Sequence, residues 1–268
     1  MRDLGKQNVL GVLVDAVDYE AAAEKIIGAA RDGRAFAGSA LAVHGVMTGV
    51  GDREHRFRLN HFDLVTPDGQ PVRWALNLLY GARLGDRVYG PNLALRIYAA
   101  AAEQGLPIYL YGSRPEVLDR LVLNLQRRNP GLIVAGAEPS KFRRISLAEK
   151  GQIVERIKRS GAKVVLVGLG CPRQEIFVHE YHDALSMPVL AVGAAFDYHA
   201  GLVGEPPLLL QRLGLQWLYR LVQQPSRLWK RYLLLNPAYV GLLALQGLKL
   251  WRPDPTVEEP PRHQMMYG

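Results

Sequence analysis

The stretch KVVLVGLGCPRQEIF, residues 163–177, combines three features that together indicate a fold class. A β-branched apolar run comes first, a glycine-rich turn follows, and Pro172 stands where a helix can begin. A buried strand that passes through a short turn into a helix is the repeating unit of α/β proteins. We therefore expect this strand to belong to a parallel sheet covered by helices.

The neighbouring sequence repeats this alternation. The predicted strands of the second half are residues 107–111, 132–136, 163–169 and 188–193. The predicted helices are residues 114–129, 146–160 and 173–185. The first half is less regular and predicts a helix over 18–32 and strands over 34–43 and 62–66. The expected fold is Rossmann-like α/β, a parallel sheet with helices on both faces and two subdomains that share a cleft.

Positive charge is concentrated near the C-terminus. The chain has a net charge of +8, and residues 206–252 hold seven Lys or Arg and no Asp or Glu. We expect a nearly neutral α/β body over 1–205 and a basic helical appendage over 206–252. The composition of 253–268, with four prolines and mixed charge, predicts a disordered tail.

The appendage combines basic and aromatic residues. Arg227, Lys230 and Arg231 have i, i+3, i+4 spacing, which places them on one helix face, and Trp229 and Tyr232 interleave with them. This composition is typical of a helix in a membrane interface, and the alternative is a helix packed on the body with a solvated basic face. Residues 233–250 are too interrupted by polar residues to predict a membrane span.

The cysteine and the histidines of the chain bear on its disulfides, its cellular compartment and its metal sites. The single cysteine, Cys171, excludes a disulfide framework and suits a reducing cytoplasm. The N-terminus has no apolar core of a signal peptide, so we expect a cytoplasmic protein at the inner face of the membrane. His179 and His182 do not form an HExxH motif, and the sequence contains no Cys/His cluster and no Asp-x-Asp pair. We therefore predict no metal site and no cofactor.

The stretch DLVTPDGQPVRWAL, residues 63–76, predicts a strand, a turn and a helix that begins near Pro71. Its Asp68 either projects into the crevice at the carboxyl end of the strand, where open α/β sheets bind ligands, or makes an Asx turn with Gly69. Arg87, in DRVYGPNL at 86–93, either clamps a phosphate or is an ordinary surface arginine. These are the first two candidate site residues.

The glycine-rich turn of 163–177 is the next candidate. Backbone N–H groups at a helix N-terminus bind diphosphates, and the pattern is neither GxGxxG nor a Walker loop. A plain strand–helix turn is the alternative. The candidate donor-binding residues here are Gly168, Gly170, Pro172, Gln174 and Glu175. In VGAAFDYHAG, residues 192–201, Asp197 joins this set, although Asp197 and His199 are more often caps or satisfied hydrogen-bonding groups than catalysts.

The motifs TPDG, RVYGPNL, GCPRQE, AFDYHAG, LGLQWLYRL and PSRLWKRY follow one another in this order. In this combination the chain resembles the WecG/TagA/CpsF family of bacterial glycosyltransferases from about residue 8 to about residue 235. The resemblance implies an inverting, metal-independent transfer from a UDP-sugar to a polyprenyl-diphosphate-linked sugar. It also implies a peripheral enzyme of cell-surface polysaccharide synthesis.

The resemblance assigns roles by matching positions. Asp68 matches the general base, Arg87 the residue that stabilises the leaving diphosphate, and Gln174 a donor-binding residue. Arg220, Arg227 and Arg231 match arginines that complete the site at the membrane and meet the lipid diphosphate. Lys230 shares a helix face with Arg227 and Arg231. The TPDG and RVYGP variants look more like exopolysaccharide members than N-acetylmannosaminyltransferases, so the donor sugar stays open.

Two departures from the family pattern bear on the sugar contacts. Family members commonly carry Thr-x-Asn at the end of an early strand, whereas residues 39–44 read SALAVH. Asn92 stands where Asp is common. Two other classes of protein fit the sequence less well. A nucleic-acid-binding protein does not explain the glycine-containing strand ends, and an NAD(P)-dependent oxidoreductase would need a fingerprint that this chain lacks. We expect no nucleic-acid partner.

Overall fold

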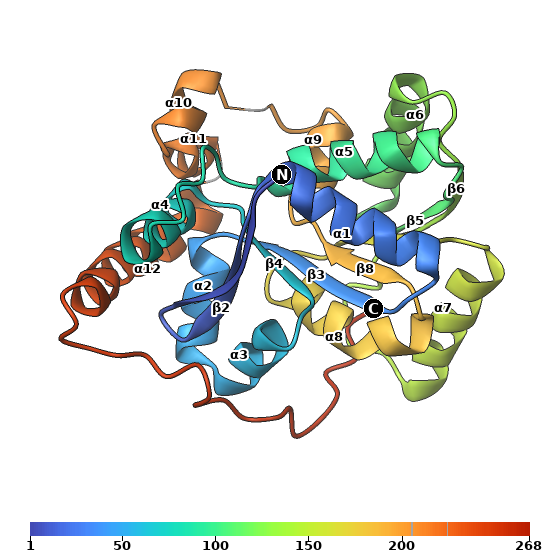
Figure 1. Cartoon of the computed structure of the whole chain (residues 1–268). Helices are drawn as coiled ribbons and strands as arrows, with labels where there is room; N and C mark the ends of the chain where they lie inside the picture. Colours follow the sequence, from blue (N-terminus) through green and yellow to red (C-terminus); the bar gives the residue numbers. More distant parts are fainter. Residues whose placement is uncertain (205, 224) are drawn as a thin grey trace.

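Six parallel strands form the centre of the molecule, as seen in a computed structural model that describes residues 1–204, 206–223 and 225–268 (Figure 1). Their order in the sheet is β4-β3-β8-β7-β5-β6. The strands are β3 (Phe36–Leu41), β4 (Leu64–Pro67), β5 (Ile108–Gly112), β6 (Val134–Glu138), β7 (Val164–Gly168) and β8 (Pro188–Ala191). The expected parallel α/β sheet is confirmed.

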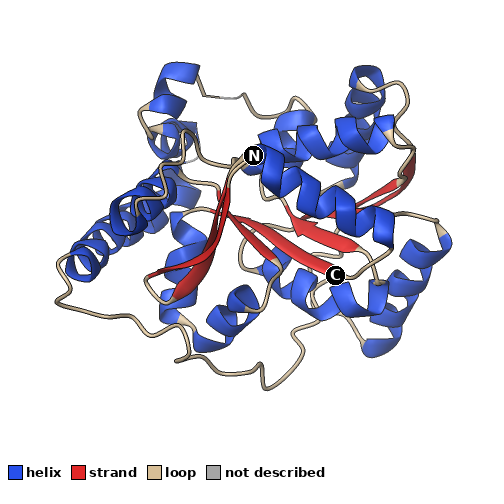
Figure 2. Cartoon of the chain, in the orientation of Figure 1, coloured by secondary structure: helices blue, strands red, loops and turns tan. Residues whose placement is uncertain are grey.

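Helices cover both faces of this sheet (Figures 1 and 2). One hydrophobic core is shared by α1 (Tyr19–Asp32), α5 (Gly90–Glu103), α6 (Pro115–Arg128) and α9 (Ala195–His199). The opposite core is shared by α2 (Val43–Gly51), α3 (Arg53–Asn60), α4 (Gln70–Tyr80), α7 (Leu147–Arg159) and α8 (Arg173–Leu185). The central strands β5, β7 and β8 are apolar because they are buried between these two layers, whereas the edge strand β6 is only partly buried and ends in Glu138.

Local signals explain where two of these helices begin and end. The Ser146 side chain accepts from the Glu149 N–H, and the Glu149 carboxylate accepts from the Ser146 N–H, which forms the capping box at the start of α7. The Asp18 side chain caps α1, and Gly33 ends it with a positive φ of 63°. These predicted boundaries are therefore correct to within one or two residues.

An antiparallel hairpin precedes the sheet and was not predicted. It consists of β1 (Asp3–Val9) and β2 (Val12–Val17), joined by Leu10 and Gly11, both with positive φ. The buried Asp15 side chain accepts from the Val65 N–H at 2.7 Å, which attaches the hairpin to β4. The two-residue turn lacks the Asn-Gly or Asp-Gly signal that identifies a hairpin in a sequence.

The C-terminal segment is helical and packs on the body. It contains α10 (Leu208–Arg212), α11 (Gln216–Gln223) and α12 (Pro225–Gly247). Tyr239 of α12 is 1% exposed, and its hydroxyl donates to the Pro71 carbonyl at 3.2 Å, next to the start of α4. Among the described residues, each helix is either too short or too polar to cross a membrane.

Residues 253–268 lie along the body, contrary to the expectation of a disordered tail. Asn60 donates to the Pro255 carbonyl, and the Met265 and Met266 N–H groups donate to the Glu180 carboxylate. Tyr267 forms a β-bridge with Arg144. Composition did not reveal these contacts because the partners lie on other elements.

Candidate active site

Asp68 lies at the carboxyl edge of the sheet, directly after β4. Its N–H donates to the Leu41 carbonyl at the end of β3, and α4 begins two residues later. The Asp68 Oδ1 accepts from the Gly90 N–H at 3.0 Å, so the carboxylate is bonded to α5 and not to its own turn. The structure thus favours the projecting position of Asp68 over the Asx turn.

A short chain of contacts connects Asp68 with the glycine-rich turn after β7. A Cβ on Gly90 would lie 3.0 Å from the Ala40 Cβ and 3.1 Å from the Val192 carbonyl, so glycine permits the start of α5 to approach β3 and β8 closely. Gly193, which follows Val192 in the chain, donates its N–H to the Gln174 Oε1 at 3.2 Å. Because β4, β3, β8 and β7 are neighbours in the sheet, motifs that are far apart in the sequence meet at one edge.

Gln174 holds two glycine turns together. Its Oε1 accepts from the N–H groups of Gly170 and Gly193, and its Nε2 donates to the Glu175 carboxylate at 2.8 Å. Gln174 is 2% exposed and Glu175 is 0% exposed. Burial raises the pKa of Glu175, and hydrogen bonds from Gln174 and Ser39 oppose that rise. In this arrangement both side chains support the turn from beneath.

The predicted strand–turn–helix around residues 163–177 is present. A Cβ on Gly168 would lie 2.6 Å from the Phe196 ring, and Gly170 has a φ of 76°, so both positions require glycine. Pro172 directly precedes α8. Asp197 lies half-buried in α9, at the end of the neighbouring strand. The six candidate donor-binding residues therefore lie at the ends of β7 and β8, and their contact with a donor stays a prediction.

Two arginines bring positive charge to Asp68. Arg87 is 6% exposed, and its guanidinium lies 4.2 Å above the Tyr89 ring. Its Nη1 donates to the Gln216 Oε1 of α11, so the C-terminal segment contacts the site directly. Arg220 of α11 is a second positive charge that acts on Asp68.

The electrostatics of Asp68 differ from those of an exposed aspartate. Burial raises its pKa, and the charge of Arg87, the Gly90 hydrogen bond and the charge of Arg220 act in the opposite direction. Asp68 forms no direct ion pair with any residue that the structure describes. The Asp68 carboxylate thus combines a raised pKa with positive charge in its surroundings, a combination that is common at functional sites.

The family comparison decides the class of protein. The model of the Glycosyl transferase WecG/TagA/CpsF family matches residues 7–253 of the 268. The chain belongs to this family. It is therefore a glycosyltransferase of cell-surface polysaccharide synthesis, and its substrates are a sugar donor and an acceptor.

Several residues around the glycosyltransferase site were missed by the sequence analysis. The Tyr89 and Tyr198 rings lie 6.3 Å apart and edge to face beside Arg87 and Arg220. Gln216 fixes the Arg87 side chain. Tyr89 stands within the quoted RVYGPNL motif, which was the available signal. By contrast, His199 is buried and its ring packs against Tyr98, with ring centroids 5.8 Å apart.

The candidate acceptor and membrane residues of the glycosyltransferase are only partly described. The charge of Arg220 acts on Asp68, as described above. Arg227, Lys230 and Arg231 belong to α12, and their side chains lie outside the described part of the structure. Their roles remain predictions based on sequence spacing.

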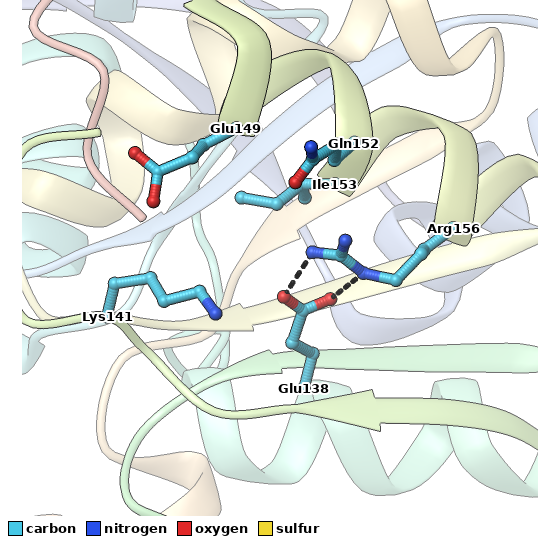
Figure 3. A pocket seen from close by; sticks show the side chains of 6 residues that line it. All are labelled: Glu138, Lys141, Glu149, Gln152, Ile153 and Arg156. Atoms are coloured by element: carbon cyan, nitrogen blue, oxygen red, sulfur yellow. Dashed lines mark hydrogen bonds and ion pairs between the residues drawn. The ribbon is translucent and has the colours of Figure 1, made fainter. Parts of the chain in front are cut away.

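A pocket of about 340 Å³ lies elsewhere in the glycosyltransferase, between β6 and α7 (Figure 3). Figure 3 shows Arg156 bridging the two oxygens of Glu138 across it, with hydrogen bonds of 3.0 and 2.7 Å. Lys141 and Glu149 complete the charged rim. Because β6 is the sheet edge opposite β4, this pocket is separate from the Asp68 site.

Proposed function

We propose that this glycosyltransferase inverts the anomeric centre of a UDP-sugar as it transfers the sugar to a polyprenyl-diphosphate-linked saccharide at the inner face of the cell membrane. The observation that carries the proposal is the position of Asp68. It is a carboxylate of raised pKa at a strand end, next to Arg87 and Arg220.

The reaction needs one base and one displacement. The Asp68 carboxylate takes the proton of the acceptor hydroxyl while that oxygen attacks the anomeric carbon. The new glycosidic bond forms as the bond from the anomeric carbon to UDP breaks, and the electron pair leaves with UDP. A single displacement of this kind inverts the configuration.

Positive side chains, in place of a metal ion, stabilise the departing diphosphate in this proposal. Arg87 is held in place by Tyr89 and Gln216, and Arg220 acts from α11 on the same carboxylate. Fixed charges that meet developing negative charge lower the barrier without a reorganisation cost. We expect transfer to continue in EDTA. Restoration of a lost activity by Mn²⁺ or Mg²⁺ after chelation would contradict this prediction.

The donor is expected at the ends of β7 and β8. The backbone around Gly168, Gly170 and Pro172 offers N–H groups at the start of α8 to a diphosphate. Gln174 fixes this backbone, Glu175 fixes Gln174, and Asp197 stands at the neighbouring strand end. The exopolysaccharide-like motifs favour a hexosyl donor, and an N-acetylmannosaminyl donor is the alternative.

The C-terminal segment supports attachment to a membrane surface. Large apolar side chains are exposed along α10–α12, among them Leu209, Val222, Leu233, Leu234 and Val240, each more than half exposed. Basic residues of the same segment attract anionic lipid, and exposed apolar side chains can enter the interface. The acceptor diphosphate stays at the membrane surface, so the C-terminal segment would contact both the lipid and the acceptor.

The test is a thermal-shift screen with UDP-sugars, UDP, NAD and duplex DNA, followed by a transfer assay. We expect UDP and one UDP-sugar to raise the midpoint of unfolding. We also expect that sugar to be transferred to a short-chain polyprenyl-diphosphate saccharide with inversion, as read by NMR of the product. Stabilisation by NAD or DNA and not by UDP would support one of the alternative classes. A retained anomeric configuration would contradict the single displacement.

A further inference from the structure

Three side chains from separate elements converge beneath the glycine-rich turn. They are His55 of α3, Cys171 of the turn after β7, and Glu175 of α8. One ligand atom of each, an imidazole nitrogen, the thiol sulfur and a carboxylate oxygen, lies within 4.8 Å of the other two. His55 is 1% exposed, Glu175 is 0% exposed and Cys171 is half-buried.

Much of the hydrogen-bonding capacity at this point is unused. Among the described residues, neither ring nitrogen of His55 has a partner, and neither has the Glu175 Oε2. The other oxygen of Glu175 accepts from Ser39 and Gln174, which fixes the carboxylate in the cluster. The Cys171 thiol also hydrogen-bonds Glu175, so the imidazole is the member of the cluster that is left without any partner among the described residues. Buried polar atoms are nearly always satisfied, so a buried imidazole of this kind beside a thiol and a carboxylate indicates a missing ligand.

We propose that His55, Cys171 and Glu175 form a binding site for a thiophilic divalent cation of the Zn²⁺ class. Imidazole nitrogen, thiolate sulfur and carboxylate oxygen are the donors that Zn²⁺ takes, whereas Mg²⁺ and Ca²⁺ take oxygen. Binding displaces the thiol proton to solvent. One thiolate, one carboxylate and a neutral imidazole then balance the two positive charges, so the buried site carries no net charge. Because Zn²⁺ bonds are ~2.0–2.3 Å long, the three ligand atoms would have to move roughly 1 Å closer to one another on binding.

The cation would have a positioning role. Glu175 bonds Gln174, and Gln174 holds the N–H groups of Gly170 and Gly193. A metal on Glu175 therefore stiffens the turn at the ends of β7 and β8 from beneath, away from Asp68. The inference does not depend on the proposed chemistry, and it differs from a Mn²⁺ or Mg²⁺ ion on the donor diphosphate. It differs from the expectation of no metal site, which considered only ligands close together in the sequence.

The test is a titration of the purified, metal-free full chain with Co²⁺, followed by competition with Zn²⁺. Because Cys171 is the only cysteine, a thiolate-to-cobalt charge-transfer band can arise from this residue alone. We expect one Co²⁺ per chain, a band that Zn²⁺ abolishes, and a rise in the midpoint of thermal unfolding with Zn²⁺.

Variants separate a metal site from a hydrogen-bonded cluster. C171S should lose the band, and H55Q should weaken Co²⁺ and Zn²⁺ binding at least tenfold. H263Q, which changes an exposed histidine of the tail, is the control and should match the unchanged protein. C171S replaces the thiol with a hydroxyl of similar size, so it remains informative if H55Q fails to fold. Absence of the band from the unchanged protein, or a Zn²⁺-dependent stabilisation that C171S retains, would overturn the proposal.

Discussion

Two carboxylates end the outermost strands of the same sheet, and their surroundings differ. Glu138, the last residue of β6, receives two hydrogen bonds from Arg156, at 3.0 and 2.7 Å. Asp68, the residue after β4, receives one backbone hydrogen bond and has its arginines nearby without direct pairing among the described residues. The Arg156 side chain is 46% exposed, whereas Arg87 is 6% exposed.

The difference separates an ion pair that holds structure from a site that can do chemistry. A carboxylate whose two oxygens are both held by one guanidinium, as Glu138 is by Arg156, is fixed in place and has less acceptor capacity left for a substrate. Because the Arg156 side chain is half-exposed and screened by solvent, we expect this pair to contribute on the order of 1 kcal/mol to stability. A half-buried carboxylate of raised pKa, with positive charge in its surroundings, is suited to accept a proton. We therefore propose that the β4 edge of the glycosyltransferase carries the chemistry and that the β6 edge contributes to stability.

The largest expected effect follows from replacing the Asp68 carboxylate. D68N should lower the transfer rate by ~10²–10⁴-fold while UDP binding and the midpoint of unfolding stay close to those of the unchanged protein. E138Q is the matched control, and we expect a rate within about twofold and a loss of at most ~1 kcal/mol in stability. Single-turnover kinetics and thermal unfolding measure both. If D68N kept most of its transfer rate, or if E138Q lost as much of its rate as D68N, the proposed difference between the two carboxylates would be wrong.

The arginines should show the next largest effect. R87A and R220A should each lower kcat/KM on the order of 10²-fold, because each removes a charge that meets the leaving diphosphate. R156A should leave kcat/KM unchanged, since Arg156 serves Glu138. Equal losses in all three variants would point to general destabilisation, which circular dichroism and unfolding curves would reveal.

The membrane contribution is smaller. Replacing Arg227 and Arg231 with Gln should weaken binding to anionic vesicles roughly fivefold for each residue, since a basic side chain near such a surface contributes ~1 kcal/mol. The loss should be larger at low salt than at high salt. R156Q with R159Q, two basic residues of α7 in the body, forms the control pair. Vesicle sedimentation measures the effect, and equal binding by both double variants would remove the proposed role of the segment.

The smallest expected effect is a shift in pH dependence. Because burial raises the pKa of Asp68 above the ordinary value of 3.8, kcat/KM should fall on the acid side as Asp68 gains a proton. R220A removes a charge that lowers this pKa, so the acid limb of its residual activity should move to higher pH. R156A should leave the limb in place. Movement to lower pH in R220A would contradict the assigned coupling between Arg220 and Asp68.

The sequence predicted the body well where local signals are strong. The expected strands 107–111, 163–169 and 188–193 correspond to β5, β7 and β8, and the helix over 173–185 has the predicted bounds. Buried parallel strands read as continuous apolar runs, and glycine, proline and capping residues mark their ends. The hairpin was missed because its turn lacks the usual residues. The tail was misjudged because its contacts involve distant partners.

The residue types of the site were available from the sequence, since Asp68, Arg87 and Gln174 stand in its motifs. Tertiary structure decided what each one touches. The strand order brings β4, β3, β8 and β7 together, so Asp68 approaches Gln174 through Gly90 and Gly193. The tertiary structure also brings His55 close to Cys171, which their spacing along the chain does not suggest. Periodicity and turn chemistry act between near neighbours, whereas burial, pKa and ligand geometry depend on residues that only folding brings into contact.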